Sequence, residues 1–186
     1  MTNPNKYIER AELLTARDAR EVDLHYALTG RQPHIWRNYP ANTPVSAICD
    51  KHGEYPEYSF MVRTPNRPEH RMCSICPACA SIALEGAEQA LLDHRIADLL
   101  NCAGIGRRFE RCELDNYEAV NADAERNRET CRRYADTWPE RLAAGTCMAM
   151  IGRCGTGKNH LAVGLAKKII RDHRASILIT DVMQIT

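Results

Sequence analysis

The alternation of apolar and polar residues predicts four helices along this chain of 186 residues. They cover residues 5–29, 81–101, 121–144 and 159–173. The first helix has its apolar residues on a broad face and ends before Gly30, a residue that favours helix termination. That face can pack on the adjoining module or dock on a partner, and the pattern leaves both interpretations open. The third helix is mostly polar, and Trp138 and Leu142 are its expected core contacts.

Two short apolar runs on either side of the last helix predict strands. Residues 146–151 precede this helix, and residues 176–180 follow it. The order strand, loop, helix, strand is typical of a βαβ unit, in which the two strands run parallel. The pattern therefore predicts an α/β fold with an incomplete parallel sheet, because about two strands are present.

The loop between the predicted strand 146–151 and its helix has the pattern Gly-x-x-x-x-Gly-Lys of a phosphate-binding loop. Glycines let the backbone N–H groups point at phosphate oxygens, and Lys158 adds a positive charge at the β- and γ-phosphates. Asn159 occupies the position where Ser or Thr usually holds Mg²⁺, so we expect ATP binding with weaker metal-assisted hydrolysis. The candidate nucleotide-binding residues are Gly152, Arg153, Cys154, Gly155, Thr156, Gly157, Lys158, Asn159 and His160.

Four residues in the first half of the chain have the spacing of metal ligands. Cys49 and His52 form one pair, and Cys76 and Cys79 form the other, each with two intervening residues. Such pairs let the chain wrap around one tetrahedral ion, and four N/S ligands are typical of a structural zinc site. A short hairpin is expected between the pairs.

Two other ligand assignments stay open at this stage. Cys73 is the alternative cysteine, because it also stands three residues before Cys76, and His70 is a weaker candidate. Free cysteines without metal and redox-active cysteines are the remaining alternatives.

Composition narrows the class of protein. The net charge is +1, so no overall field favours nucleic acid or membrane. No apolar run approaches ~18 residues, and no secretory signal pattern opens the chain, so we expect a cytoplasmic protein without a membrane span. In that compartment nine cysteines favour a metal site and free thiols over disulfides.

Three parts of the chain together resemble the bacterial helicase loader DnaC. Residues 155–162, Gly-Thr-Gly-Lys-Asn-His-Leu-Ala, resemble the ATPase loop of that family, in which Asn-His-Leu-Ala follows the lysine. Residues 103–109 and 114–117 are similar to the segment that leads into the loader's AAA+ domain and lies near the adenine. Residues 49–53 with 76–79 resemble the N-terminal zinc module of phage and prophage DnaC-like proteins.

The resemblance implies an ATP-binding helicase loader that binds single-stranded DNA and docks on the replicative helicase. It implies a P-loop AAA+ domain over 104–186, preceded by an N-terminal helix and loop over 1–48 and a zinc module with a connector helix over 49–103. ATP, Mg²⁺ and Zn²⁺ are the implied cofactors. Homo-oligomers are expected only if the rest of an AAA+ domain is present.

Catalytic residues are not assigned, because hydrolysis needs an acidic metal ligand and a positive group at the transition state. No apolar strand ending in Asp-Glu, no sensor residue and no arginine finger is recognised before Thr186, so a truncated loader is expected. Two alternatives stay open. One is a zinc-dependent adaptor without enzymatic activity that binds helicase or DNA. The other is a fragment of a transposition-helper ATPase, a family that shares Gly-Thr-Gly-Lys but usually continues with Thr.

Overall fold

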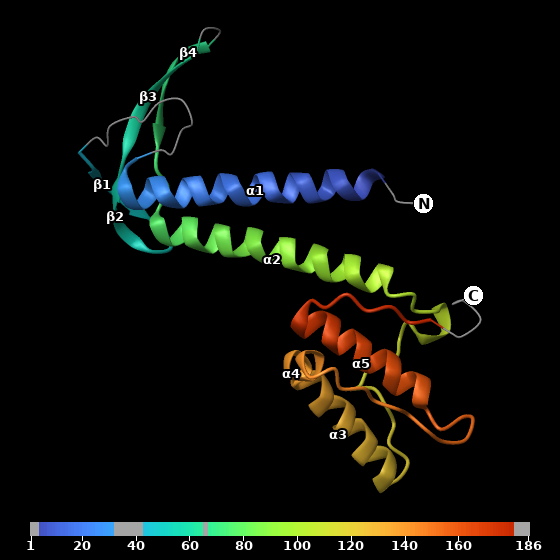
Figure 1. Ribbon diagram of the computed structural model, residues 1–186. Coiled ribbons are helices and arrows are strands. Elements are labelled where there is room, and N and C mark those ends of the chain that lie inside the picture. The colour runs from blue at the N-terminus through green and yellow to red at the C-terminus, as the bar shows by residue number, and fades with distance from the viewer. Residues whose placement is uncertain (1–3, 32–42, 65–66, 181–186) are drawn as a thin grey trace. The chain divides into compact units, whose positions relative to one another are not determined.

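The computed structural model describes residues 4–31, 43–64 and 67–180 (Figure 1). Packing divides the chain into two compact units, Met1–Asp93 and His94–Thr186. Helices and strands both occur, which confirms a mixed α/β protein, and the strands form two separate two-stranded antiparallel sheets. The division predicted at residues 48 and 103 stays a prediction.

The first unit consists of two β-hairpins flanked by long helices. Its elements are α1 (Pro4–Thr29), β1 (Val45–Cys49), β2 (Gly53–Glu57), β3 (Ser59–Thr64), β4 (Arg67–Cys73) and α2 (Pro77–Cys102), the last of which crosses the unit boundary. The hairpin expected between the ligand pairs is β3–β4, in which Ser59 lies opposite Cys73. A second hairpin, β1–β2, contains the first ligand pair itself and places Cys49 opposite Gly53.

Aromatic rings join the end of α1 to the β3–β4 hairpin. The rings of Tyr26 and Phe60 meet edge to face with their centroids 5.4 Å apart, and both residues are buried. Gly30 follows α1 with φ +67°, and a Cβ there would lie 2.3 Å from the ring of Tyr58. Gly30 therefore ends the helix and also makes room for the hairpin.

The second unit is a layer of helices. It contains the 3₁₀ turn η1 (Arg107–Phe109), α3 (Ala122–Asp136), α4 (Trp138–Ala143) and α5 (Lys158–His173). The single helix predicted over 121–144 is wrong, because the chain breaks at Thr137, where φ is −102° and ψ is 23°. Pro139 lacks an N–H and its ring would clash with the carbonyl four residues back, so one continuous helix cannot form.

The core of the second unit lies between α3 and α5. Its buried members are Leu114, Cys131, Ala135, Leu161, Leu165 and Ile169. Trp138 packs against this cluster as predicted. The expectation for Leu142 is wrong, because this side chain is 63% exposed on the short helix α4.

The two strands predicted around α5 are not strands in the described residues, so the expected parallel sheet is absent there. Both segments keep the burial pattern of a strand, because Met148, Met150 and Ile177 pack against the core while the residues between them are exposed. A strand requires a partner that completes its backbone ladder, and neither segment pairs with another strand. The apolar pattern therefore predicted the buried face correctly and the hydrogen bonding incorrectly.

None of the helices among the described residues is long and apolar enough to cross a membrane.

Candidate functional site

Glycines give the loop before α5 a backbone conformation that other residues rarely adopt. Gly155 and Gly157 both have positive φ, of 79° and 76°, a region that other residues rarely adopt. Gly157 is also the N-cap of α5, which begins at Lys158. The loop therefore places unpaired backbone N–H groups and the positive end of a helix dipole at one point.

The side chain of Lys158 folds back over its own loop. Its Nζ donates to the carbonyl oxygens of Gly152 at 2.9 Å and Arg153 at 2.7 Å. Thr156 Oγ1 donates to the same Arg153 oxygen at 2.9 Å. The ammonium group thus lies within the ring of the loop, where it can exchange these carbonyls for the oxygens of an anion.

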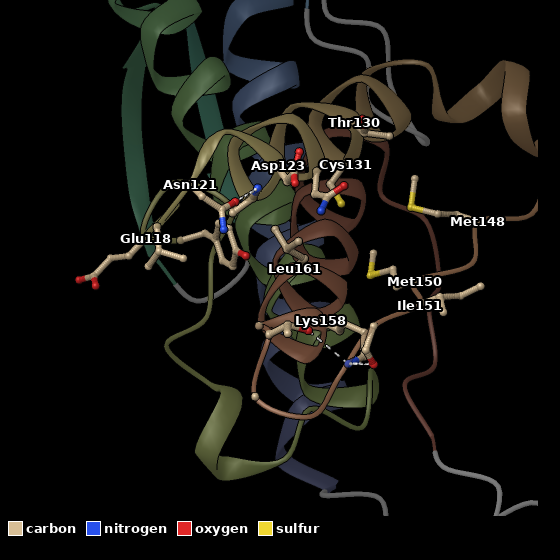
Figure 2. A pocket seen from close by; sticks show the side chains of 18 of the residues that line it. Glu118, Asn121, Asp123, Thr130, Cys131, Met148, Met150, Ile151, Lys158 and Leu161 are labelled. Atoms are coloured by element: carbon tan, nitrogen blue, oxygen red, sulfur yellow. Dashed lines mark hydrogen bonds between the residues drawn. The ribbon is translucent and has the colours of Figure 1, made fainter.

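A cavity of about 820 Å³ opens beside the loop (Figure 2). Its walls come from the loop, from residues 148–152 and from the first half of α3, with Leu161 and Cys131 among its apolar lining. Asn121, Asn127 and Thr130 give it a polar side. Volumes of this order are typical of small-molecule sites that combine apolar walls with a few polar groups.

The remaining predicted loop residues lie at different depths. Cys154 and Asn159 are exposed, and His160 is half-buried in the first turn of α5. His160 Nε2 lies 2.9 Å from both the Glu113 carbonyl oxygen and Asn116 Oδ1. These contacts join the loop helix to a segment more than forty residues earlier.

Sequence reasoning did not find the ion pairs that hold this earlier segment. Glu113 accepts from Lys167 Nζ at 3.0 Å and from both terminal nitrogens of Arg171. The pKa of Glu113 lies below its ordinary value, chiefly because Arg171 donates to it and also because Lys167 does. A lysine on the apolar face of the predicted helix was the one signal in the sequence, since a buried lysine requires a partner.

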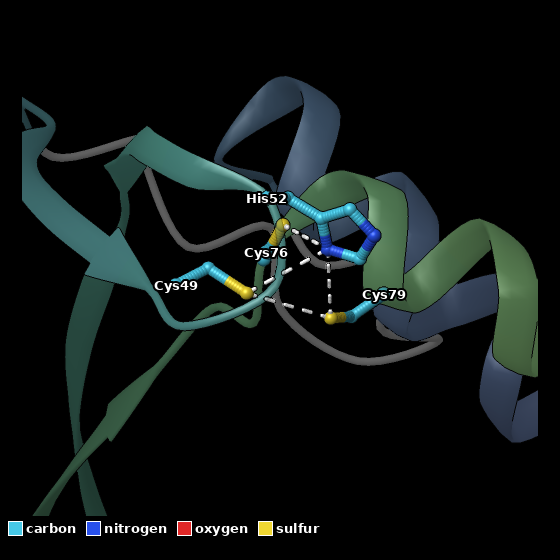
Figure 3. Close-up of side chains that lie close together, drawn as sticks. All are labelled: Cys49, His52, Cys76 and Cys79. Carbon is cyan, nitrogen blue, oxygen red and sulfur yellow. Dashed lines mark hydrogen bonds between the residues drawn. The ribbon is translucent and has the colours of Figure 1, made fainter.

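The four predicted metal ligands meet in the first unit (Figure 3). Cys49 ends β1 and His52 lies in the following turn, whereas Cys76 precedes α2 and Cys79 lies in its first turn. Gly53 has φ +79° at the end of the turn, and Pro77 begins the helix. Both residues suit these tight connections, because glycine tolerates positive φ and proline is favoured in a first helical turn.

The distances within this Cys₃His group match a tetrahedral ion. His52 Nδ1 lies 3.6, 3.6 and 3.3 Å from the sulfurs of Cys49, Cys76 and Cys79, and the Cys49 and Cys79 sulfurs are 3.7 Å apart. Zinc–sulfur and zinc–nitrogen bonds at tetrahedral angles require edges of about 3.8 Å for S···S and about 3.6 Å for S···N. The group can therefore hold a metal ion such as zinc.

The electrostatics of the group favour a thiolate even without an ion. Hydrogen bonds from the Lys51 backbone and from His52 lower the pKa of the Cys49 thiol to about 6. The hydrogen bond with Cys49 raises the pKa of Cys79 to about 11. The surroundings of Cys49 therefore favour the deprotonated form, which is the form that binds a metal ion.

The alternative cysteine, Cys73, does not join this group. Cys73 is exposed at the end of β4 and lies outside the cluster of four. The side chain of His70 is outside what the structure describes. The geometry therefore brings together the pair Cys76 and Cys79 with Cys49 and His52.

Three proteins share detectable sequence similarity with the chain. It is 32% identical over 91 residues to protein YdaV of Escherichia coli (strain K12), which covers 48% of this chain and 36% of YdaV. It is 29% identical over 82 residues to the replicative helicase loader DnaC of Buchnera aphidicola subsp. Acyrthosiphon pisum, covering 44% and 32% of the two chains. The loader of subsp. Schizaphis graminum is 33% identical over 84 residues, covering 45% and 32%.

The similarity to the DnaC helicase loaders is distant, because the identities are 29% and 33% over less than half of this chain. The chain spans about a third of the length of each relative. No protein-family model matches the chain, and no solved structure matches it. The similarity supports a distant DnaC-like, replication-related protein. It does not test the zinc module or the AAA+ fold.

Proposed function

We propose that this protein is an ATP-binding DNA replication protein of the helicase-loader type. ATP would bind with its phosphates at the loop Gly152–Asn159 and the rest of the nucleotide in the adjoining cavity. The observation that carries the proposal is the position of Lys158, whose ammonium lies inside a loop with two glycines at positive φ. The two helicase loaders among the relatives support the same function.

Recognition of the phosphates follows from the residues around the loop. Backbone N–H groups from Gly155 to Lys158 would donate to the phosphate oxygens, and Lys158 would neutralise charge at the β- and γ-phosphates. Asn159 would help to hold Mg²⁺, because its side-chain amide has an oxygen that could serve as a ligand. Hydrolysis is not part of the proposal, because no acidic ligand or second cation is assigned.

Binding of ATP to purified protein by calorimetry tests the proposal. Lys158→Ala should weaken binding by about tenfold or more, because it removes a charge-assisted contact with the phosphates. Lys168→Ala is the matched control, because this lysine lies on the same helix and pairs with Asp136 and Asp172 instead. An unmodified protein that fails to bind ATP would contradict the proposal.

Partner binding extends the proposal to a replicative helicase and single-stranded DNA. The loader relatives support the helicase partner. Co-sedimentation of the full chain with a purified replicative helicase, with and without ATP, measures this step. Fluorescence anisotropy with a labelled DNA single strand measures binding to single-stranded DNA.

A second candidate is a zinc-dependent adaptor that binds the helicase without using ATP. The tetrahedral spacing of Cys49, His52, Cys76 and Cys79 favours it, because a structural ion would fix the first unit as a docking module. Under this proposal Cys79→Ser abolishes helicase binding, whereas Lys158→Ala leaves it unchanged. The reverse outcome would favour the nucleotide-dependent loader.

A further inference from the structure

His160 donates a hydrogen bond from the first turn of α5 to the segment before α3. Its Nε2 faces two oxygens, the Glu113 carbonyl and Asn116 Oδ1, each at 2.9 Å. The amide of Asn116 is oriented independently, because its Oδ1 accepts from Glu113 N–H at 2.9 Å and its Nδ2 donates to the Arg111 carbonyl at 2.6 Å. Both groups that face Nε2 are therefore acceptors, and Nε2 must have the hydrogen.

The next residue of that segment, Tyr117, covers the phosphate loop. Its ring meets the ring of His160 edge to face, with centroids 5.3 Å apart and planes at 77°. The ring also lies against Gly157, where a Cβ would be 2.8 Å from Tyr117 Cε2. Tyr117 thus occupies the space beside Gly157, the N-cap of α5, whose backbone is in the left-handed region.

The segment is fixed elsewhere by contacts that do not reach the loop. Glu113 pairs with Lys167 and Arg171 further along α5. Close backbone packing at Gly164, where a Cβ would lie 2.7 Å from Leu114 N, keeps the same stretch near the helix. Among the described contacts, His160 is therefore the hydrogen-bonding side chain that links Asn116, directly before Tyr117, to the loop end of α5.

We propose that His160 is a positioning residue, which holds Tyr117 against Gly157 and so fixes the conformation in which the loop receives phosphate. The contact would preorganise the backbone N–H groups from Gly155 to Lys158, which lowers the entropy lost when an anion binds. The consequence for affinity rests on the proposed nucleotide binding. The positioning itself does not require a nucleotide and is tested without one.

Hydrogen exchange followed by mass spectrometry tests the positioning on the full chain without ligand. His160→Leu removes the donor at similar size, and we expect faster exchange in peptides covering 111–117 and 152–159. His160→Gln retains an N–H donor at a similar reach and should restore slow exchange in both. His173→Leu is the matched control, because His173 Nε2 contacts the Ala135 carbonyl at 2.7 Å at the other end of α5.

The control separates positioning from general loss of stability. His173→Leu should destabilise the second unit without a selective increase in the exchange rate at residues 152–159. Unchanged exchange at 152–159 in His160→Leu, or an equal increase in His173→Leu, would overturn the proposal. Failure of His160→Gln to restore protection would do the same.

Calorimetry with ATP and with inorganic tripolyphosphate tests the consequence for binding. A preorganised loop predicts that His160→Leu weakens both ligands by a similar factor, about five- to tenfold for one lost hydrogen bond and its ordering effect. A loss confined to ATP would overturn the proposal, since it would place the effect at the nucleoside. If the unmodified protein binds neither ligand, nucleotide binding fails, and the exchange experiment still decides the role of His160.

Discussion

The ammonium of Lys167 lies 3.0 Å from Glu113 Oε1, although these residues are more than fifty positions apart in the sequence. Lys167 is buried, and its Nζ also donates to the Glu110 carbonyl. Arg171 donates to both carboxylate oxygens of Glu113, at 2.6 and 2.8 Å. One carboxylate therefore pairs with two cations of α5 and fixes the segment that leads to Tyr117.

Replacement of Glu113 should destabilise the second unit. Glu113→Gln leaves the buried ammonium of Lys167 without its counter-charge, and we expect a loss of about 2 kcal/mol in the free energy of unfolding at neutral pH. Urea denaturation measures this loss. Glu110→Gln is the matched control, because Glu110 contributes its backbone carbonyl to Lys167, and equal losses in both variants would contradict the assignment.

The same carboxylate predicts a dependence of stability on pH. The pKa of Glu113 in the folded protein lies below its ordinary value of 4.5, chiefly because of Arg171 and then Lys167. A lowered pKa stabilises the folded state above pH 4.5, and this contribution is lost as pH falls through the folded pKa. The difference in unfolding free energy between the unmodified protein and Glu113→Gln should therefore shrink below pH 4.5. A difference that stays constant in acid would contradict this.

The close approach of the Glu113–Leu114 backbone to α5 predicts that a methyl group at position 164 is not tolerated. A Cβ on Gly164 would meet Leu114 N at 2.7 Å, and backbone cannot move aside as a side chain can. Gly164→Ala should cost about 1–3 kcal/mol of stability, despite the higher helix propensity of alanine. Gly86, inside α2, has no atom within 4 Å of its Cβ position, so Gly86→Ala should stabilise the protein by up to about 1 kcal/mol. Thermal denaturation of both variants checks the contrast.

The Cys₃His group predicts which cysteine affects metal content. Purified protein should contain about one zinc ion per chain, and Cys79→Ser should lose it together with part of its thermal stability. Cys73→Ser should keep the ion, because Cys73 is outside the group. Elemental analysis by mass spectrometry measures the content. Loss of zinc in Cys73→Ser but not in Cys79→Ser would contradict the assignment and would identify Cys73 as the ligand in place of Cys79.

The contact between Tyr117 and Gly157 predicts different effects of alanine at the two loop glycines. Gly155→Ala adds only the strain of positive φ, about 1–2 kcal/mol, because open space surrounds its Cβ position. Gly157→Ala adds the same strain and a collision with the Tyr117 ring. Gly157→Ala should therefore be the more destabilising, and the further change Tyr117→Ala should cost less in its presence than alone. A double-mutant cycle measured by urea denaturation tests this, and additive effects would contradict the contact.

Local features of the chain could be predicted from the sequence because their physical cause is local. The phosphate-loop pattern can be read from glycines and a lysine that lie close together in the sequence, and Gly155 and Gly157 of this loop have positive φ. The two ligand pairs could be recognised because a chain returns to one ion over two intervening residues. The amphipathic helices α1, α2 and α5 follow from residues three or four positions apart in the same way.

Only the tertiary structure decided between Cys73 and Cys79, because both lie three residues from Cys76. Cys73 ends a paired strand and is exposed, whereas Cys79 is turned toward His52 by the first turn of α2. The strands expected around α5 also could not be decided from the sequence. Alternation of apolar residues specifies which face is buried, but a strand also needs a hydrogen-bonding partner from a distant part of the chain. The roles of Glu113, Tyr117 and His160 depend on contacts across more than forty residues, which local spacing cannot encode.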